Sequence, residues 1–155
     1  MLHIAFLADR PELVPMVAGW HYKEWGGGYP GGSHAMWTET LRGQLGRDAI
    51  PMSWVAILDG EPVGSVKLIE QDMATHPELS PWLSSLYVVD EHRGEGIAAK
   101  LIDRCETAAR TLGHETIYLY TTTAEGIFLK AGWQTRSRER YGDEQVAILS
   151  KRVVT

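Results

Sequence analysis

Apolar and polar positions alternate along this chain in two periods, and the change from one to the other predicts its secondary structure. Short runs rich in β-branched and aromatic residues predict strands at 2–8, 53–58, 63–69, 82–89 and 116–121, with two more flanking a turn at 141–143. Helical spacing predicts a first helix with Pro11 in its first turn, a second from 33 to about 46, a third over 96–112 and a fourth over 124–130. The order β, α, α, β, β, β, α, β, α, β, β is typical of an α/β fold whose mixed sheet is covered by helices on both faces.

Local signals mark several element ends. Asp9 is expected to cap the first helix, and the glycine-rich run 26–32 ends that helix. Ser33 is expected to cap the second helix, and Gly113 to end the third. The segment 59–62, Asp-Gly-Glu-Pro, predicts a tight turn between two antiparallel strands.

Size and composition narrow the functional classes. The 155 residues, 44% hydrophobic and 23% charged, suit a single domain over residues 1–155. No apolar run reaches membrane-spanning length and the first residues do not form an export signal, so we expect a cytoplasmic protein without a membrane partner. Cys105 is the single cysteine, which excludes an internal disulfide and a cysteine-rich metal site. The six histidines lack metal-ligand spacing, so no metal is expected.

The net charge of −5 changes the picture of partners. Proteins that bind nucleic acid usually carry a basic face, so no nucleic-acid partner is expected. The charge is compatible with a cationic substrate such as an amine, although mild acidity also serves solubility alone.

The segment 85–101 carries the most chemistry. An apolar strand runs into the turn 93–98, and that turn opens a helix whose first N–H groups have no intrahelical partner. Gly94 and Gly96 let the backbone approach an anion closely, and a diphosphate suits such a place. Three interpretations compete: a turn without a ligand, a dinucleotide site and a coenzyme A site. The run 94–99 satisfies G-x-G-x-x-G/A, but the 100–155 remainder is too short to complete a dinucleotide-binding domain.

Several motifs in one register favour the coenzyme A interpretation. Arg93-x-x-Gly96-x-Ala98 matches the Q/R-x-x-G-x-G/A signature of the GNAT acetyltransferases, and the segments 60–64, 86–93 and 127–133 resemble further parts of that family in the same order. The resemblance spans residues 53–133. It implies a mostly antiparallel sheet of about seven strands, flanked by about four helices and splayed between strands 4 and 5. It also implies an acetyl-CoA-dependent N-acetyltransferase that acts on a primary amine of a small molecule or a peptide.

The resemblance also assigns residues to the cofactor. Backbone groups of the fourth strand would pair with pantetheine, and the N–H groups of the turn would hold the diphosphate. Two threonines at the end of the fifth strand would lie near the thioester, although β-propensity alone also explains them. The expected pantetheine residues are Leu86, Tyr87 and Val88, and the expected diphosphate residues are Arg93, Gly94, Glu95, Gly96, Ile97 and Ala98. The two threonines near the thioester are Thr121 and Thr122. The backbone N–H of Val88 is the expected donor to the thioester oxygen.

The resemblance does not assign the general acid and the general base to single residues. Phe128 stands where many relatives have a tyrosine acid, and the strand at 82–85 lacks the carboxylate that some relatives have there. The candidates are Tyr120, Glu24 and Asp72: Tyr120 could instead be a core aromatic and Asp72 a solvated loop residue, whereas Glu24 on the first helix could face the acceptor site. A water chain could also serve as the base. These departures leave open a non-catalytic acyl-CoA-binding module or sensor.

The acceptor pocket is expected from the first two helices and their loop. Aromatic side chains concentrate there, which suits a cation or an apolar group, although the same rings could simply pack the helices on the sheet. The candidates are His21, Tyr22, Trp25, Tyr29 and Trp37. A homodimer through the last strand is a further expectation from the resemblance.

Overall fold

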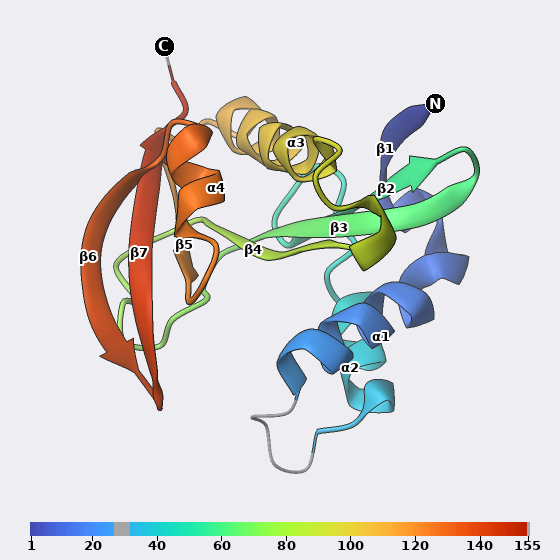
Figure 1. Cartoon of the computed structure of the whole chain (residues 1–155), viewed down its shortest axis with the longest axis horizontal. Coiled ribbons are helices and arrows are strands. Elements are labelled where there is room, and N and C mark those ends of the chain that lie inside the picture. Colours follow the sequence, from blue (N-terminus) through green and yellow to red (C-terminus); the bar gives the residue numbers. More distant parts are fainter. Residues whose placement is uncertain (27–31, 155) are drawn as a thin grey trace.

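The computed structural model describes residues 1–26 and 32–154, and it contains one seven-stranded sheet (Figure 1). The strand order is β1-β2-β3-β4-β5-β7-β6, and every neighbouring pair is antiparallel except the parallel pair β4–β5. The strands are β1 (Leu2–Phe6), β2 (Met52–Leu58), β3 (Glu61–Ile69), β4 (Trp82–Val88), β5 (Thr116–Thr121), β6 (Gln134–Tyr141) and β7 (Glu144–Arg152). The predicted fold class is thus confirmed.

In the described residues four α-helices cover the sheet, α1 and α2 on one face and α3 and α4 on the other (Figure 1). They are α1 (Val14–Trp25), α2 (His34–Arg42), α3 (Ile97–Thr111) and α4 (Glu125–Lys130). Three short 3-10 turns precede α1 and α3: η1 (Leu7–Asp9), η2 (Pro11–Leu13) and η4 (Asp90–His92).

Two of the predicted helix ends differ from the structure. The prediction that Asp9 caps the first helix is wrong: Asp9 closes a 3-10 turn, and its carboxylate pairs with Arg47 instead. The second helix ends at Arg42, before the predicted boundary near residue 46. Its predicted cap is confirmed, because the Ser33 hydroxyl accepts a hydrogen bond of 3.2 Å from the Met36 N–H.

Alternation along the central strands builds two separate cores. On β2, Trp54 and Ala56 face α3, whereas Val55 and Ile57 face α1 and α2. Each face therefore needs its own covering helices, and the two helix layers follow from one strand pattern.

The strands β4 and β5 separate almost at once, which confirms the predicted splay. Their single paired position joins Trp82 to Tyr118, and Figure 1 shows β4 running away from β5 beyond it. The register of β4 with β3 also shifts near Ser85, whose φ of +54° is unusual for a residue with a side chain. The bulge turns β4 away from its parallel neighbour and opens a gap in the middle of the sheet.

Below this gap, the loop between β3 and β4 is anchored by its own apolar residues. Met73 and Leu79 are buried against Trp82 and Ile148, and the Trp82 indole donates a 2.7 Å hydrogen bond to the Leu79 carbonyl. The loop is therefore packed onto the sheet, and its polar residues have defined positions. Among the described residues, no helix is both long and apolar enough to cross a membrane.

Candidate active site

The turn after β4 presents a row of unpaired backbone donors. Gly94 and Gly96 have φ values of +83° and +85°, and a Cβ built on either would meet nothing within 4 Å. Within the described part of the chain, the N–H groups from Gly94 to Ala99 have no hydrogen-bond acceptor. Unpaired N–H groups at a helix start favour an anion, so this turn fits the diphosphate of coenzyme A.

Arg93 ties this turn to the end of β4. Its Nε donates to the Val88 carbonyl at 2.9 Å, and its Nη1 lies 2.8 Å from Oδ1 of Asp90. The guanidinium also lies 5.6 Å from the centre of the Tyr87 ring. The side chain thus fixes the geometry of the turn, and its own backbone N–H is bonded to Asp90 within η4.

The gap edge of β4 offers a free donor. The Val89 N–H donates to the Val63 carbonyl on β3 at 2.9 Å, so strand alternation points the Val88 N–H and carbonyl the other way, into the gap. The Val88 carbonyl is taken by Arg93, which leaves its N–H available to an added strand or an oxyanion.

A partly buried group of charged and polar side chains lies on the α1 and α2 face of β3 and β4. The Lys67 Nζ donates to Oε1 of Gln44 at 2.9 Å, and the Ser84 hydroxyl lies 3.3 Å from the Ser85 hydroxyl. Burial raises the pKa of Asp72 to about 6, and Lys67 and Ser84 oppose that rise. Burial likewise lowers the pKa of Lys67 to about 8, with Asp72 acting in the other direction.

His21 lies in the core between α1 and β3. It is 2% exposed, its Nε2 is 2.8 Å from the Ser65 hydroxyl, and burial followed by the Lys67 charge lowers its pKa to about 3. The imidazole is therefore neutral at ordinary pH and links a helix to the sheet, a position that solvent does not reach.

The other aromatic candidates form a partly exposed group beside β4. Trp20 stacks on Tyr87 at 5.5 Å between ring centres, and Trp25 meets the same ring edge-on at 6.4 Å. Tyr22 lies 6.2 Å from Trp37, which packs against the α1–α2 core. Trp25 and Tyr22 remain 38% and 36% exposed, so both can meet a ligand. Tyr29 lies outside the described residues.

The remaining sequence candidates lie around β5, α4 and the end of α1. Thr121 accepts a 3.0 Å hydrogen bond from the Ala124 N–H and so shapes the turn into α4, while Thr122 is exposed. Tyr120 packs edge-on to Trp82 at 6.2 Å, as a core aromatic would. Glu24 is exposed at the end of α1, near the Tyr87 hydroxyl, whose pKa is raised mainly by burial and further by nearby carboxylates that include Glu24.

Phe128 offers no proton to a leaving thiolate. It is 4% exposed and packs edge-on against Trp133 at 5.6 Å. Its place in the family motif is thus filled by a core side chain.

Sequence reasoning missed Lys67, Ser84 and Gln44. A signal was present for Lys67, because a lysine in the apolar run 63–69 must either face solvent or be paired inside the protein. No comparable signal marks the other two, whose roles depend on contacts across strands.

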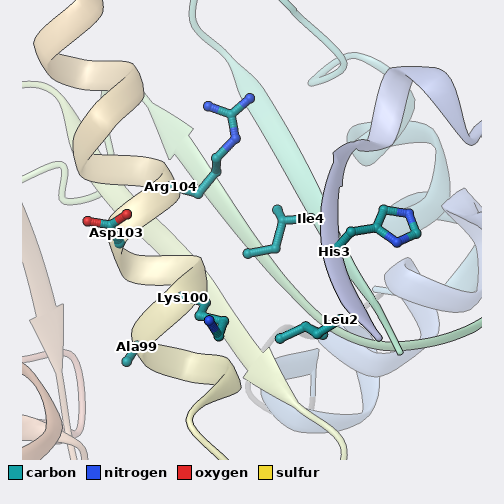
Figure 2. Close-up of a pocket in the computed structure, with 7 residues that line it drawn as sticks. All are labelled: Leu2, His3, Ile4, Ala99, Lys100, Asp103 and Arg104. Atoms are coloured by element: carbon teal, nitrogen blue, oxygen red, sulfur yellow. The ribbon is translucent and has the colours of Figure 1, made fainter. Parts of the chain in front are cut away.

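A hollow lies elsewhere in the molecule. It has a volume of about 420 Å³ and runs between β1 and the first turns of α3 (Figure 2). Leu2 and Ile4 point toward the helix, and His3 points away from it. None of its lining residues comes from β4 or β5: they are Leu2, His3, Ile4, Ala99, Lys100, Asp103 and Arg104. In the described part of the chain, no three His, Cys, Asp or Glu side chains gather in a way that could hold a metal ion.

Comparison with known proteins identifies the family. Residues 14–131 match the sequence profile of the Acetyltransferase (GNAT) family, so the chain belongs to the GNAT acetyltransferases, enzymes that use acetyl-CoA. The resemblance found in the sequence is therefore confirmed. A search of curated proteins finds no match.

Solved structures share the fold at low sequence identity. An aminoglycoside 6'-N-acetyltransferase from Enterococcus faecium has a TM-score of 0.75 and 16% identity, over 99% of this chain and 98% of that one. An aminoglycoside 6'-N-acetyltransferase complexed with coenzyme A gives 0.77 and 16%, over 99% and 98%. A spermidine N-acetyltransferase chimera from Vibrio cholerae and hSSAT gives 0.74 and 18%, over 98% and 95%.

Proposed function

We propose that this protein transfers the acetyl group of acetyl-CoA to a primary amine. The observation that carries the proposal is a pair of parallel strands that separate after one paired position, with a turn of unpaired N–H groups at the end of one of them. A long ligand with a diphosphate at one end and a peptide-like arm at the other matches both features.

In this proposal two segments of the chain bind different parts of the cofactor. The backbone from Leu86 to Val88 pairs with the pantetheine amides, and the N–H groups from Gly94 to Ala98 hold the diphosphate. Bound acetyl-CoA supplies an acyl group activated by its thioester. The Val88 N–H, free on the gap edge, donates to the thioester oxygen and stabilises the negative charge that develops there.

The acceptor site is proposed on the α1 and α2 face. The exposed edges of Tyr22 and Trp25 suit a cation, and the net charge of −5 favours its approach. Two of the solved relatives carry names of enzymes that acetylate aminoglycosides and spermidine, both of which are amines. We place the whole reaction in one domain, residues 1–155, with a small-molecule or peptide amine as acceptor. The expectation that the last strand pairs with a second copy is wrong, because β7 lies between β5 and β6; a homodimer is proposed instead along the edge strand β6.

A second function is favoured by one specific observation. Phe128 is buried where a proton donor is expected, and β4 carries no carboxylate. A protein that binds acetyl-CoA without transferring the acetyl group would tolerate both departures, so a non-catalytic acyl-CoA sensor is the alternative.

Calorimetric titration with acetyl-CoA tests what the two functions share. We expect one molecule of acetyl-CoA bound per chain. Acetyl-pantetheine should bind more weakly, because it lacks the diphosphate. Equal affinity for acetyl-CoA and acetyl-pantetheine would contradict the role of the turn. Transfer to amines then separates the enzyme from the sensor.

A further inference from the structure

The hollow between β1 and α3 belongs neither to the cofactor gap nor to the proposed acceptor face (Figure 2). Its volume of about 420 Å³ is within the range of small-molecule sites, roughly 300–1,000 Å³. β1 is the edge strand of the sheet, and β2 and β3 separate it from β4, where the gap opens. The hollow is therefore separate from the gap, although α3 borders both.

One wall of the hollow is apolar. Leu2 and Ile4 of β1 point toward α3 (Figure 2), and both side chains are only partly buried against the core under that helix. Phe6 follows them in the same strand alternation and is also partly exposed. Water still reaches this row of apolar side chains, so a ligand that covers them gains free energy.

The facing wall carries two positive charges. Lys100 and Arg104 are four residues apart in α3, so they lie on one face of the helix. Within the described residues, neither cation forms an ion pair with a carboxylate. The Arg104 guanidinium lies over two rings instead, 5.1 Å from the centre of Phe6 and 5.8 Å from that of Trp54. Both cations are thus available to an anion.

A further donor lies beside Arg104. Trp54 is fully buried, and its indole N–H has no hydrogen-bond partner in the described part of the chain. Such a buried donor is uncommon and costs free energy. Asp103, the acid among the lining residues, extends from α3 on the side away from β1 (Figure 2). Cations and donors therefore dominate the side of α3 that faces the apolar wall, and they favour a negatively charged ligand.

From these observations we propose that the β1–α3 hollow binds a small amphipathic carboxylate. Its apolar tail lies along Leu2 and Ile4, and its carboxylate pairs with Arg104 and Lys100. A guanidinium binds a carboxylate through two parallel hydrogen bonds, and a lysine adds a point charge beside them. The binding is non-covalent. It is a second site on the protein, and it does not depend on the proposed acetyl transfer.

Calorimetric titration of the full chain with octanoate, octanol and acetate tests both walls. We expect one octanoate per chain. Octanol and acetate should bind about ten-fold more weakly or less, because octanol lacks the charge and acetate lacks the tail. Equal affinity for octanoate and octanol would overturn the proposal, because the cations would then take no part. Tighter binding of octylammonium than of octanoate would overturn it as well.

Variants of the two cations test the charged wall. Arg104→Gln should weaken octanoate binding about ten-fold, the scale of a hydrogen bond to a charged group. This variant also removes the contacts with the two rings, so Lys100→Gln, at an exposed position, isolates the charge. It should weaken binding about two- to five-fold. The matched control is Lys130→Gln, an exposed cation on α4. Equal losses in Lys100→Gln and Lys130→Gln would overturn the proposal.

Backbone amide NMR of the full chain locates the bound octanoate. We expect shifts in Leu2–Phe6 and 99–104, and octanoate should stay bound when acetyl-CoA is saturating. Displacement by acetyl-CoA, or shifts concentrated in β4 and β5, would assign octanoate to the cofactor gap and overturn the proposal. Sedimentation provides the last check, because a dimer that buries β1 would mean that a second copy of the chain covers the hollow instead.

Discussion

Single backbone positions decide whether the cofactor turn can form. Gly96 has a φ of +85°, which β-branched residues rarely adopt, and it starts α3 among the unpaired N–H groups. We therefore expect Gly96→Val to weaken acetyl-CoA binding at least ten-fold, because strain of about 1–3 kcal/mol distorts the donors and the new side chain covers them. Calorimetric titration measures the affinity.

A second glycine provides the matched control. Gly60 lies in the β2–β3 hairpin with a φ of +86° and, like Gly96, has open space where a Cβ would be. Gly60→Val should lower the melting temperature by a similar amount but leave acetyl-CoA affinity unchanged. Equal losses of affinity in both variants would mean that general strain, and not the turn, governs binding.

One histidine links the β3–β4 loop to the edge of the sheet. The His76 ring nitrogens lie 3.1 Å from Glu78 and 2.6 Å from Glu139, which raises its pKa above the ordinary 6.5. Ionised carboxylates only accept hydrogen bonds, so both nitrogens must carry protons. The stabilisation is complete below pH 6.5 and is lost as the pH rises through the raised folded-state pKa.

We accordingly expect His76→Gln to lower the melting temperature by about 1–4 °C at pH 6 and by less at pH 9, the scale of a partly exposed ion pair. Differential scanning calorimetry at both pH values gives the two differences. A gap between wild type and variant that widens toward pH 9 would contradict the imidazolium assignment.

At the scale of elements, the contact between β3 and β4 has no spare room. A Cβ on Gly64 would lie 2.8 Å from the Tyr87 carbonyl oxygen and 3.1 Å from a Leu101 methyl group. Gly64→Ala should therefore reduce the free energy of unfolding by about 1–3 kcal/mol, as overpacking does, and should weaken acetyl-CoA binding by displacing β4.

Gly126 in α4 offers the opposite test. A Cβ there would meet nothing within 4 Å, so Gly126→Ala should be neutral or stabilising by up to about 1 kcal/mol. Urea unfolding of both variants gives the free energies. Similar destabilisation in the two would remove the close-contact explanation.

The element order could be predicted because each strand and helix carries its own period. All seven strands and all four α-helices were expected from alternation, helical spacing and turn residues, and α2 begins after its predicted cap, Ser33. The predicted start of the first helix at Asp9 was wrong, because the Asp9 carboxylate pairs with Arg47, which is distant in the sequence. A cap and an ion pair use the same oxygens, and the sequence does not say which partner is nearer in the fold.

Part of the candidate site could likewise be predicted from the sequence, and part could not. The cofactor turn depends on adjacent residues, so its glycines and helix start could be placed from the sequence. The Asp72 environment depends on Lys67, Ser84 and Gln44, which three other segments bring together. Burial and charge at that point exist only once the sheet has formed, so the sequence alone does not indicate them.

At the scale of the whole molecule, the sheet is two packed halves joined at one residue pair. The core under α3 crosses this junction, because it contains residues of β2, β3 and β4 together with Ile117 and Leu119 of β5 and Leu149 of β7. The shared core therefore holds the two halves together, while the backbone edges of β4 and β5 separate beyond their single paired position.

Burial of the cysteine should give a thiol assay a low background. Cys105 is fully buried, and burial, with a smaller contribution from Glu106, raises its pKa well above the ordinary value for a thiol. It should therefore react slowly with a thiol reagent in the folded protein. Coenzyme A released by transfer can then be measured against a low background.

The measurement that tests the central claim most directly is amine-dependent release of coenzyme A thiol from acetyl-CoA. The panel spans polyamines, aminoglycosides, amino acids and short peptides, with a blank that lacks amine to subtract hydrolysis and labelling of Cys105. We predict release that depends on one class of primary amine and yields the acetylated amine in equal amount. Binding of acetyl-CoA with no release above the blank for any amine would contradict the transferase assignment and favour the sensor.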